Sequence, residues 1–419
     1  MAQKKQLLAG IDVGTTKICS VCARVEDGKL EVLGTGWAPS RGLKKGVVVN
    51  LSETIDSVKA SLEEAEKQAQ VVVQSAYVSV GGAYIRGINS SGETEVHNKD
   101  GEITSEDINR AVSAATSLDL GEDYQVIHRL TRDFKVDGLE GVVDPLGLNG
   151  HHLSVSMHLV LNASAVVQNI VNAVNKAGVL VDGVVMQQLA SSEAVLSSDE
   201  KELGTILVDI GGGTTDVAVY NRGSICHSEV LPIGGDLVTK DIAIGIRAPL
   251  QEAEELKRSV GSVFPESVPA EELIEVTEVG SGCRRTLPRR RLCEIIRARC
   301  DEILQAVERT IQQVGVDKEL VTGLVMTGGG SLVDGVVDRA EQMLGLSVRV
   351  GYPINVVDRD SPVFHPSYST ALGLLKYTQN VQSPVVAKPV KAQGARPRDA
   401  RSRMKSWLLM KSWLLQKIE

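Results

Sequence analysis

The sequence predicts an α/β fold made of two related lobes that face one cleft. Short runs rich in Val and Ile alternate with longer helical patterns over most of the chain, which is typical of α/β architecture. Residues 10–17 recur in variant form at residues 208–216, and both copies contain a strand, an Asp, a glycine turn, Thr residues and a second strand. The copies lie too far apart for a solenoid repeat, so we interpret them as equivalent parts of two lobes.

The expected elements follow in order along the chain. Apolar runs of strand length fall at residues 7–13, 18–25, 76–80, 153–161, 205–210, 215–220 and 323–327. Helical patterns fall at residues 51–70, 105–117, 163–177, 251–259, 291–314 and 331–344. Ser331 follows three glycines, so we expect it to cap the last of these helices.

The chain has 419 residues, a length that suits two or three domains. The expected units are a first lobe at residues 1–83 and 162–200, an inserted subdomain at 84–161, a second lobe at 201–382 with its own subdomain at about 240–320, a linker at 383–403 and an amphipathic helix at 404–419. Loop-rich stretches are expected inside the inserted piece, at residues 89–101 and 137–150. The linker is rich in Pro, Gly and basic residues and cannot bury a core.

The composition excludes several classes of protein. Hydrophobic residues make up 42% and charged residues 23%, which excludes collagen-like and low-complexity chains. Aromatic residues make up only 3%, too few to stack single-stranded nucleic acid, so no nucleic-acid partner is expected. No apolar run reaches the ~20 residues of a spanning helix, and the amino end lacks a signal-peptide core, so we expect the body in the cytosol. The six Cys residues are expected to be reduced, because the single CxxC at residues 19–22 has no second pair at zinc spacing.

The two glycine turns are candidate phosphate sites. Glycines, which lack Cβ atoms, allow successive backbone N–H groups to turn toward an anion, and Thr hydroxyls add donors. The turns supply Gly14, Thr15, Thr16 and Lys17 in the first copy, and Gly211, Gly212, Gly213, Thr214 and Thr215 in the second. One such motif alone is explained by a tight structural turn, whereas two copies with matched Asp and Thr favour a shared phosphate site. Neither copy is a GxxxxGK[ST] or a GxGxxG motif.

Asp12 and Asp209 end the two matched strands and would both face the phosphates. Because like charges repel, we expect a cation between them, namely Mg²⁺ held largely through water. A third glycine cluster, Gly328, Gly329 and Gly330, follows a strand and suits a base or a phosphate. Glu254 and Lys257 lie three residues apart on one helix face and could bond ribose hydroxyls or form a solvated pair.

These three motifs resemble the phosphate and adenosine motifs of the actin, heat-shock 70 and sugar-kinase superfamily. Within it, the chain is similar to the FtsA family of bacterial cell-division proteins, from residue 8 to about residue 377 and again at the tail. The discriminating matches are residues 39–42, 188–192 and 369–375 and the repeated Ser-Trp pairs at 406–407 and 412–413. The resemblance implies an actin/heat-shock 70-like two-lobed fold with a nucleotide cleft between the lobes.

The resemblance also implies ATP in that cleft, with the two phosphate motifs on either side, Glu254 and Lys257 near the ribose, and the third glycine cluster around the adenosine. Where a related actin-like filament protein carries a carboxylate to orient the attacking water, this sequence has Gln188. An amide can position water but cannot accept its proton at neutral pH. Slow or absent ATP hydrolysis is therefore the expectation.

The family further implies a protein that assembles with itself on the membrane and anchors the tubulin-like FtsZ ring there. This places it at the cytoplasmic face of the inner membrane, at the division septum, with other division proteins as partners. Arg299 and Glu302 match family positions in the subdomain that receives the FtsZ C-terminal peptide. A basic run of five Arg at residues 284–291 departs from the family pattern. It is expected to be a solvated face or a site for an acidic protein partner.

Residues 404–419 predict an interfacial membrane helix. As a helix at 1.5 Å per residue, the 15 residues 404–418 extend only about 22 Å and cannot span a bilayer. From residue 388 onward, nine Lys or Arg face only two acidic residues, which favours anionic lipids as the partner. The expected contacts are Met404, Trp407, Leu408, Lys411, Trp413, Leu414, Leu415 and Ile418. A packed core helix or a helix for a protein partner is the alternative.

Two other functions stay open from the sequence. An ATP-dependent phosphotransferase of the sugar-kinase branch needs a catalytic carboxylate at the sugar, for which the sequence offers no convincing candidate, and has no use for the tail. An FtsA-like pilus assembly protein would share the fold but lack the tandem Ser-Trp helix.

Overall fold

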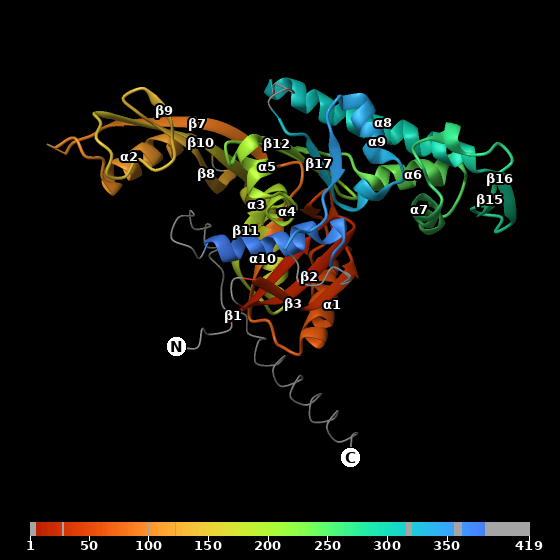
Figure 1. Ribbon diagram of the computed structural model, residues 1–419. Coiled ribbons are helices and arrows are strands. Elements are labelled where there is room, and N and C mark those ends of the chain that lie inside the picture. Colours follow the sequence, from red (N-terminus) through yellow and green to blue (C-terminus); the bar gives the residue numbers. More distant parts are fainter. Residues whose placement is uncertain are drawn as a thin grey trace, which may run out of the picture.

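The computed structural model describes residues 6–26, 29–98, 100–121, 123–315, 321–355 and 363–381. Two five-stranded mixed sheets form the centres of two lobes, and a third sheet projects from the first lobe (Figure 1). Within the described ranges, no helix is long and apolar enough to cross a membrane. The linker and terminal helix predicted at residues 383–403 and 404–419 lie outside the described residues.

The first sheet has the strand order β11-β6-β1-β2-β3. Its strands are β1 (Gln6–Val13), β2 (Lys17–Glu26), β3 (Lys29–Pro39), β6 (Ser75–Val80) and β11 (Leu180–Met186). Helices α1 (Leu51–Ala69) and α10 (Ser369–Val381) pack on opposite faces, and α3 (Ser164–Lys176) contacts α1. A Cβ on Gly10 would press on α10, and one on Gly36 would overlap α1, so glycine at these strand positions allows both helices to approach.

The second sheet repeats this arrangement in the order β14-β13-β12-β17-β18. Its strands are β12 (Thr205–Ile210), β13 (Thr215–Asn221), β14 (Ser224–Leu231), β17 (Leu324–Thr327) and β18 (Val348–Val350). In both sheets three consecutive strands pair antiparallel, and a parallel strand flanks the first of them. The structure confirms the prediction of two related α/β lobes.

Helices of the second lobe cover its sheet and extend beyond it (Figure 1). They are α6 (Gly235–Gly245), α7 (Leu250–Ser259), α8 (Arg289–Val314) and α9 (Val336–Leu344), with a hairpin of β15 (Leu273–Thr277) and β16 (Arg284–Pro288) at one end. The helix expected from Ser331 instead begins at Val336, after a 3-10 turn η2 (Gly329–Leu332). Ser331 Oγ donates to the Gly328 carbonyl, and Gly335 has φ +77°, a left-handed conformation that interrupts the helix.

The inserted region forms a four-stranded antiparallel sheet with one covering helix. The strands are β7 (Arg86–Glu95), β10 (His152–Ala163), β8 (Tyr124–Val136) and β9 (Leu139–Val142) in that spatial order, and the helix is α2 (Ser105–Thr116). Much of the stretch expected to be loop at residues 89–101 is strand β7. It is an edge strand with a largely exposed, polar face, so its sequence lacks the apolar alternation by which strands are recognised.

Two short helices, α4 (Gln187–Val195) and α5 (Ser198–Leu203), lead from the first lobe into the second. Helix α4 packs on α10 and also contacts strands of both sheets. It therefore lies between the two lobes, with its first turn near the carboxyl ends of β1 and β6.

Candidate functional site

A cavity of about 440 Å³ lies between the lobes, a volume within the range of small-molecule sites. The predicted residues that line it are Asp12, Gly14, Thr15, Thr16, Lys17, Asp209, Gly211, Gly212, Gly213, Thr214, Glu254, Lys257, Gly328, Gly329 and Gly330. Among the predicted nucleotide-binding residues Thr215 is absent from the lining, because its buried hydroxyl donates to the Ile233 carbonyl at 2.9 Å. The structure thus brings the three glycine clusters, far apart in sequence, to one cavity.

The two hairpins have the same backbone geometry. The N–H of Gly14 donates to the Lys17 carbonyl at 3.1 Å, and the N–H of Gly211 donates to the Thr214 carbonyl at 2.9 Å. Asp12 pairs with Cys19 across the first hairpin, and Asp209 pairs with Asp216 at the same register of the second.

The hairpin turns touch each other across the cavity. Thr16 Oγ1 donates to Asp236 Oδ1 at 3.1 Å, which joins the first lobe to the start of α6. A Cβ on Gly212 would overlap Thr16 Oγ1, and one on Gly213 would lie 2.7 Å from Thr15 Oγ1. Only glycine at these two positions allows the turns to approach this closely.

The paired carboxylates lie at the floor of the cavity. Asp12 Oδ1 accepts from Ser79 Oγ at 2.7 Å and from Gln187 Nε2 at 3.3 Å, while Asp209 Oδ2 accepts from Thr370 Oγ1 at 3.4 Å. Burial, and then the negative charge of Asp12, raise the pKa of Asp209 from 3.8 to about 6. Burial also raises the pKa of Asp12. Two buried carboxylates whose charges disfavour each other fit a bound cation, and carboxylate oxygen is a ligand that Mg²⁺ prefers.

A third carboxylate, Asp216, was not assigned from the sequence. It lines the cavity opposite Asp209, is buried, and its Oδ1 has no hydrogen-bond partner among the described residues. Burial and the Asp209 charge raise its pKa well above 3.8. The available sequence signal is that the second motif ends in Asp, whereas Cys19 holds the matching place in the first.

The structure does not place Gln188 at the cavity. Its side chain is fully buried and donates from Nε2 to the Glu229 carbonyl at 3.3 Å. The preceding residue, Gln187, lines the cavity and donates to Asp12. Successive side chains on a helix point about 100° apart, so neighbouring residues of α4 face different surroundings and the predicted residue points away from the cavity.

The three predicted charged side chains in the wall are already engaged by the protein. Lys17 Nζ donates to the Ser367 carbonyl and lies 4.9 Å from the ring centroid of Tyr368. Lys257 Nζ lies 2.5 Å from Glu254 Oε2, and both side chains bond Thr239 Oγ1, at 2.9 and 2.5 Å.

An apolar wall closes the second-lobe end of the cavity. It consists of Val238, Cys300, Ile303, Leu304, Leu332, Val333 and Val336, from α6, α8 and the segment around α9. Trp37, with 51% of its surface exposed, lies in the first-lobe wall. The sequence did not predict these residues, because apolar positions on a helix follow the same pattern whether they line a core or a cavity.

The predicted partner residues lie on α8, outside the cavity. Arg299 donates from Nε to Asp241 Oδ2 of α6 at 2.6 Å and from Nη1 to Glu302 Oε2 at 2.5 Å. The nearby basic run was expected to be a solvated face or a partner site, but most of its side chains bond the protein's own backbone. Four of its guanidiniums donate to backbone carbonyls: Arg285 to Ile246, Arg289 to Val260, Arg290 to Val268 and Arg291 to Gly245.

Two related lobes whose paired hairpins meet at one cavity define an actin-like protein. Solved structures with this fold include the PilM–PilN type IV pilus biogenesis complex, with TM-score 0.64, 16% identity and coverage of 90% of this chain and 99% of that one. MreB 5 of Spiroplasma citri bound to AMPPNP aligns with TM-score 0.55 and 13% identity, over 91% of this chain and 99% of its own. At these identities the likeness shows the fold alone.

Sequence comparisons identify the family. The family model "Cell division protein FtsA" matches residues 206–373, and "SHS2 domain inserted in FTSA" matches residues 82–161. FtsA of Pseudomonas aeruginosa is 41% identical over 382 residues, 91% of each chain. FtsA of Escherichia coli strain K12 is 34% identical over 415 residues, 97% of this chain and 98% of its own. The chain belongs to the FtsA family of cell-division proteins, which confirms the predicted resemblance and favours it over the sugar-kinase and pilus-assembly alternatives.

Proposed function

We propose that this protein binds ATP with Mg²⁺ between its lobes and acts as the membrane-bound adaptor of the FtsZ ring. The main support for the nucleotide site is that both glycine hairpins and the third glycine cluster line one cavity. The MreB 5 structure of the same fold has AMPPNP bound, which supports a nucleotide as the ligand.

The hairpins would hold the phosphates. Backbone N–H groups of the two turns and the hydroxyls of Thr15, Thr16 and Thr214 are the donors, with Thr215 supporting the second turn from behind. Bound Mg²⁺ would neutralise phosphate charge between Asp12 and Asp209. Within the described ranges no three His, Cys, Asp or Glu side chains form a metal cage, so we assign the remaining ligands to water and phosphate.

The nucleoside would lie toward α7 and α8. Glu254 and Lys257 are positioned for the ribose hydroxyls, once their mutual contact and their bonds to Thr239 rearrange. The apolar wall around Cys300 and Ile303 offers an apolar surface for the base. The segment at Gly328–Gly330 completes this end, and Gly329 leaves open space where a Cβ would stand.

Hydrolysis is proposed to be slow or absent. Gln187, rather than Gln188, is the amide that faces the phosphate region, and it is tied to Asp12. An amide can orient water but takes no proton from it. In this proposal ATP acts mainly as a ligand that stabilises the closed lobes for self-association.

Membrane and partner contacts rest on the sequence and the family. Residues 404–419 would lie on anionic lipid at the cytoplasmic face of the inner membrane, at the septum. Arg299 and Glu302 would contact the FtsZ C-terminal peptide, while the inserted sheet would be open to other division proteins and neighbouring copies.

The membrane role is tested by sedimentation with anionic and neutral vesicles. Replacing Trp407 and Trp413 with Glu should release the full chain from anionic vesicles while ATP affinity, measured by titration, stays unchanged. The matched control replaces exposed Glu140, paired with Lys135 at 2.8 Å, by Gln and should change neither. Undiminished sedimentation of the double variant would contradict the anchor. Electron microscopy on an anionic lipid monolayer with ATP should then show filaments of the parent chain.

A further inference from the structure

The chain crosses from one lobe to the other at the carboxyl end of α4, where two chain segments contact each other. The first leaves α4 at Val195 and enters β12 through α5. The second leaves β18 and runs along residues 351–355. The N–H of Ile354 donates to the Ala194 carbonyl at 2.8 Å, so the second segment is fixed to the end of α4.

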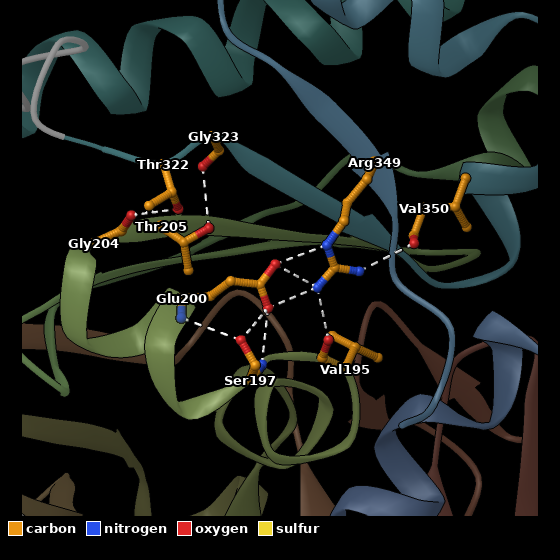
Figure 2. A network of polar contacts seen from close by, with 9 residues as sticks. All are labelled: Val195, Ser197, Glu200, Gly204, Thr205, Thr322, Gly323, Arg349 and Val350. Carbon is orange, nitrogen blue, oxygen red and sulfur yellow. Dashed lines mark hydrogen bonds and ion pairs between the residues drawn. The ribbon is translucent and has the colours of Figure 1, made fainter. Parts of the chain in front are cut away.

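The guanidinium of Arg349 links the two segments by hydrogen bonds (Figure 2). Arg349, on β18 of the second lobe, donates from Nε and Nη2 to the two carboxylate oxygens of Glu200, both at 2.8 Å. Its Nη2 also donates to the Val195 carbonyl at 2.9 Å. Bidentate, charge-assisted geometry of this kind is among the strongest side-chain contacts in proteins.

Glu200 is held in place by its own helix start. The Ser197 N–H and hydroxyl donate to Glu200 Oε2 at 2.8 and 3.0 Å, and Glu200 N–H donates back to Ser197 Oγ at 3.2 Å, which forms a capping box. The Glu200 carboxylate therefore both caps the start of α5 and binds the Arg349 guanidinium.

Arg349 and Glu200 both belong to the second lobe, because the Arg222 and Gly223 N–H groups donate to the Glu202 and Lys201 carbonyls of α5, whereas Val195 lies on the side of the first lobe. Beyond α5, Thr322 Oγ1 donates to the Gly204 carbonyl and Thr205 Oγ1 to the Gly323 carbonyl, at 2.9 and 3.1 Å, which ties that end to the second sheet (Figure 2). Val195 ends α4, which packs on α10 of the first lobe. A rotation that carries β18 away from α4 must therefore break the bond from Arg349 to Val195.

We propose that the bond from Arg349 to the Val195 carbonyl, with the guanidinium held in position by Glu200, is an interlobe latch that sets the angle between the lobes and, through it, the rate of ligand release from the cavity. Neither Arg349 nor Glu200 lines the cavity, so the latch acts on the ligand only through the lobe angle. The release part of this inference rests on the proposed nucleotide site, whereas the lobe angle does not.

The lobe angle can be measured between spin labels on Cys at two exposed positions, Lys59 of α1 and Glu255 of α7, with Cys283, the exposed native cysteine of the described residues, replaced by Ser. Glu200→Gln removes the charge, while an amide oxygen can still accept from Ser197, so the capping box is kept. Arg349→Gln removes the guanidinium. Each variant should widen the label distance distribution without nucleotide, and the double variant should add little because both changes break one contact. Release of a fluorescent ATP analogue should become at least about fivefold faster.

A matched control is the ion pair of Arg339 with Asp301, which has the same bidentate geometry at 2.7 and 2.8 Å but joins α9 to α8 within the second lobe. Arg339→Gln should lower stability and leave both the label distances and the release rate unchanged. An unchanged distance distribution in folded Glu200→Gln protein, or an equal change in Arg339→Gln, would overturn the latch. Altered distances without ATP binding to any form would support the latch and count against the nucleotide site.

Discussion

The two glycine hairpins have the same backbone geometry but differ in the side chains around their Asp residues. In the first, Asp12 accepts from Ser79 and Gln187, so its carboxylate has partners without any ligand. In the second, Asp209 faces a further acid, Asp216, whose Oδ1 is unpartnered within the described chain. The first carboxylate thus has two protein partners, while the second hairpin brings two buried acids together, and one oxygen of Asp216 has no partner within the described chain. We infer that dependence on a cation resides mainly in the second lobe.

The largest expected effect comes from Asp209→Asn. Removing this charge should weaken Mg²⁺-dependent ATP binding by about 100-fold, a typical cost of losing one partner of a buried charge pair. The same change should stabilise the ligand-free protein at pH 7, because the pKa of about 6 against 3.8 corresponds to a penalty of up to ~3 kcal/mol. Calorimetric titration with and without Mg²⁺ and a thermal melt measure the two effects.

Asp12→Asn is the comparison that sharpens this prediction. It should also reduce the Mg²⁺ dependence, but with a smaller gain in ligand-free stability, because Asp12 keeps two hydrogen bonds. Equal Mg²⁺ dependence in parent and Asp209→Asn protein would contradict the assignment of the cation to this site.

Acid should change the stability through two buried groups with opposite sign, His128 on β8 of the inserted sheet and Asp209 in the second lobe. His128, which accepts from the Met186 N–H at 2.9 Å, has its pKa lowered from 6.5 to about 4 by burial. Its protonation therefore costs stability as pH falls from 6.5 to 4, by up to ~3 kcal/mol. Asp209 has a raised pKa, so its penalty is relieved as pH falls from 6 to 3.8. Urea unfolding between pH 7 and 4.5 should show a shallower loss of stability for His128→Gln and a steeper one for Asp209→Asn. Parallel pH profiles would show that other groups control acid stability.

The next largest effect is expected from a steric change at the contact between the two hairpin turns. Gly212→Ala places a Cβ on Thr16 Oγ1 and should force the turns apart, which weakens ATP binding about tenfold. Gly329→Ala meets no atom within 4 Å in the ligand-free protein and should leave stability unchanged. Titration and thermal melts compare the two. A neutral Gly212→Ala would show that the turns need not touch.

The smallest effect is expected for Lys17→Met. Because the ammonium group already bonds the Ser367 carbonyl and lies over Tyr368, its loss should cost about 1 kcal/mol of stability and change ATP affinity less than about threefold. An affinity loss of tenfold or more would show that Lys17 leaves this contact and binds phosphate.

The sequence predicted the parts of the site that depend on local backbone chemistry. Glycine, Asp and Thr at fixed spacing disclosed both hairpins, because few residue types permit such turns. It did not predict which face of α4 meets the cavity, since Gln187 and Gln188 differ by one position. Nor did it predict the pairing of Arg349 with Glu200, because contacts between residues so far apart in sequence leave no local pattern. The start of α9 was missed because a left-handed Gly335 was indistinguishable from an ordinary loop glycine.

The position of Trp37 has a spectroscopic consequence. The chain has three tryptophans, one in the wall of the cavity and two, Trp407 and Trp413, in the tail. Intrinsic fluorescence of the parent protein therefore mixes two signals, one from the cleft and one from the tail. With Phe at both tail positions, the emission of Trp37 alone becomes a label-free optical reporter of cleft occupancy.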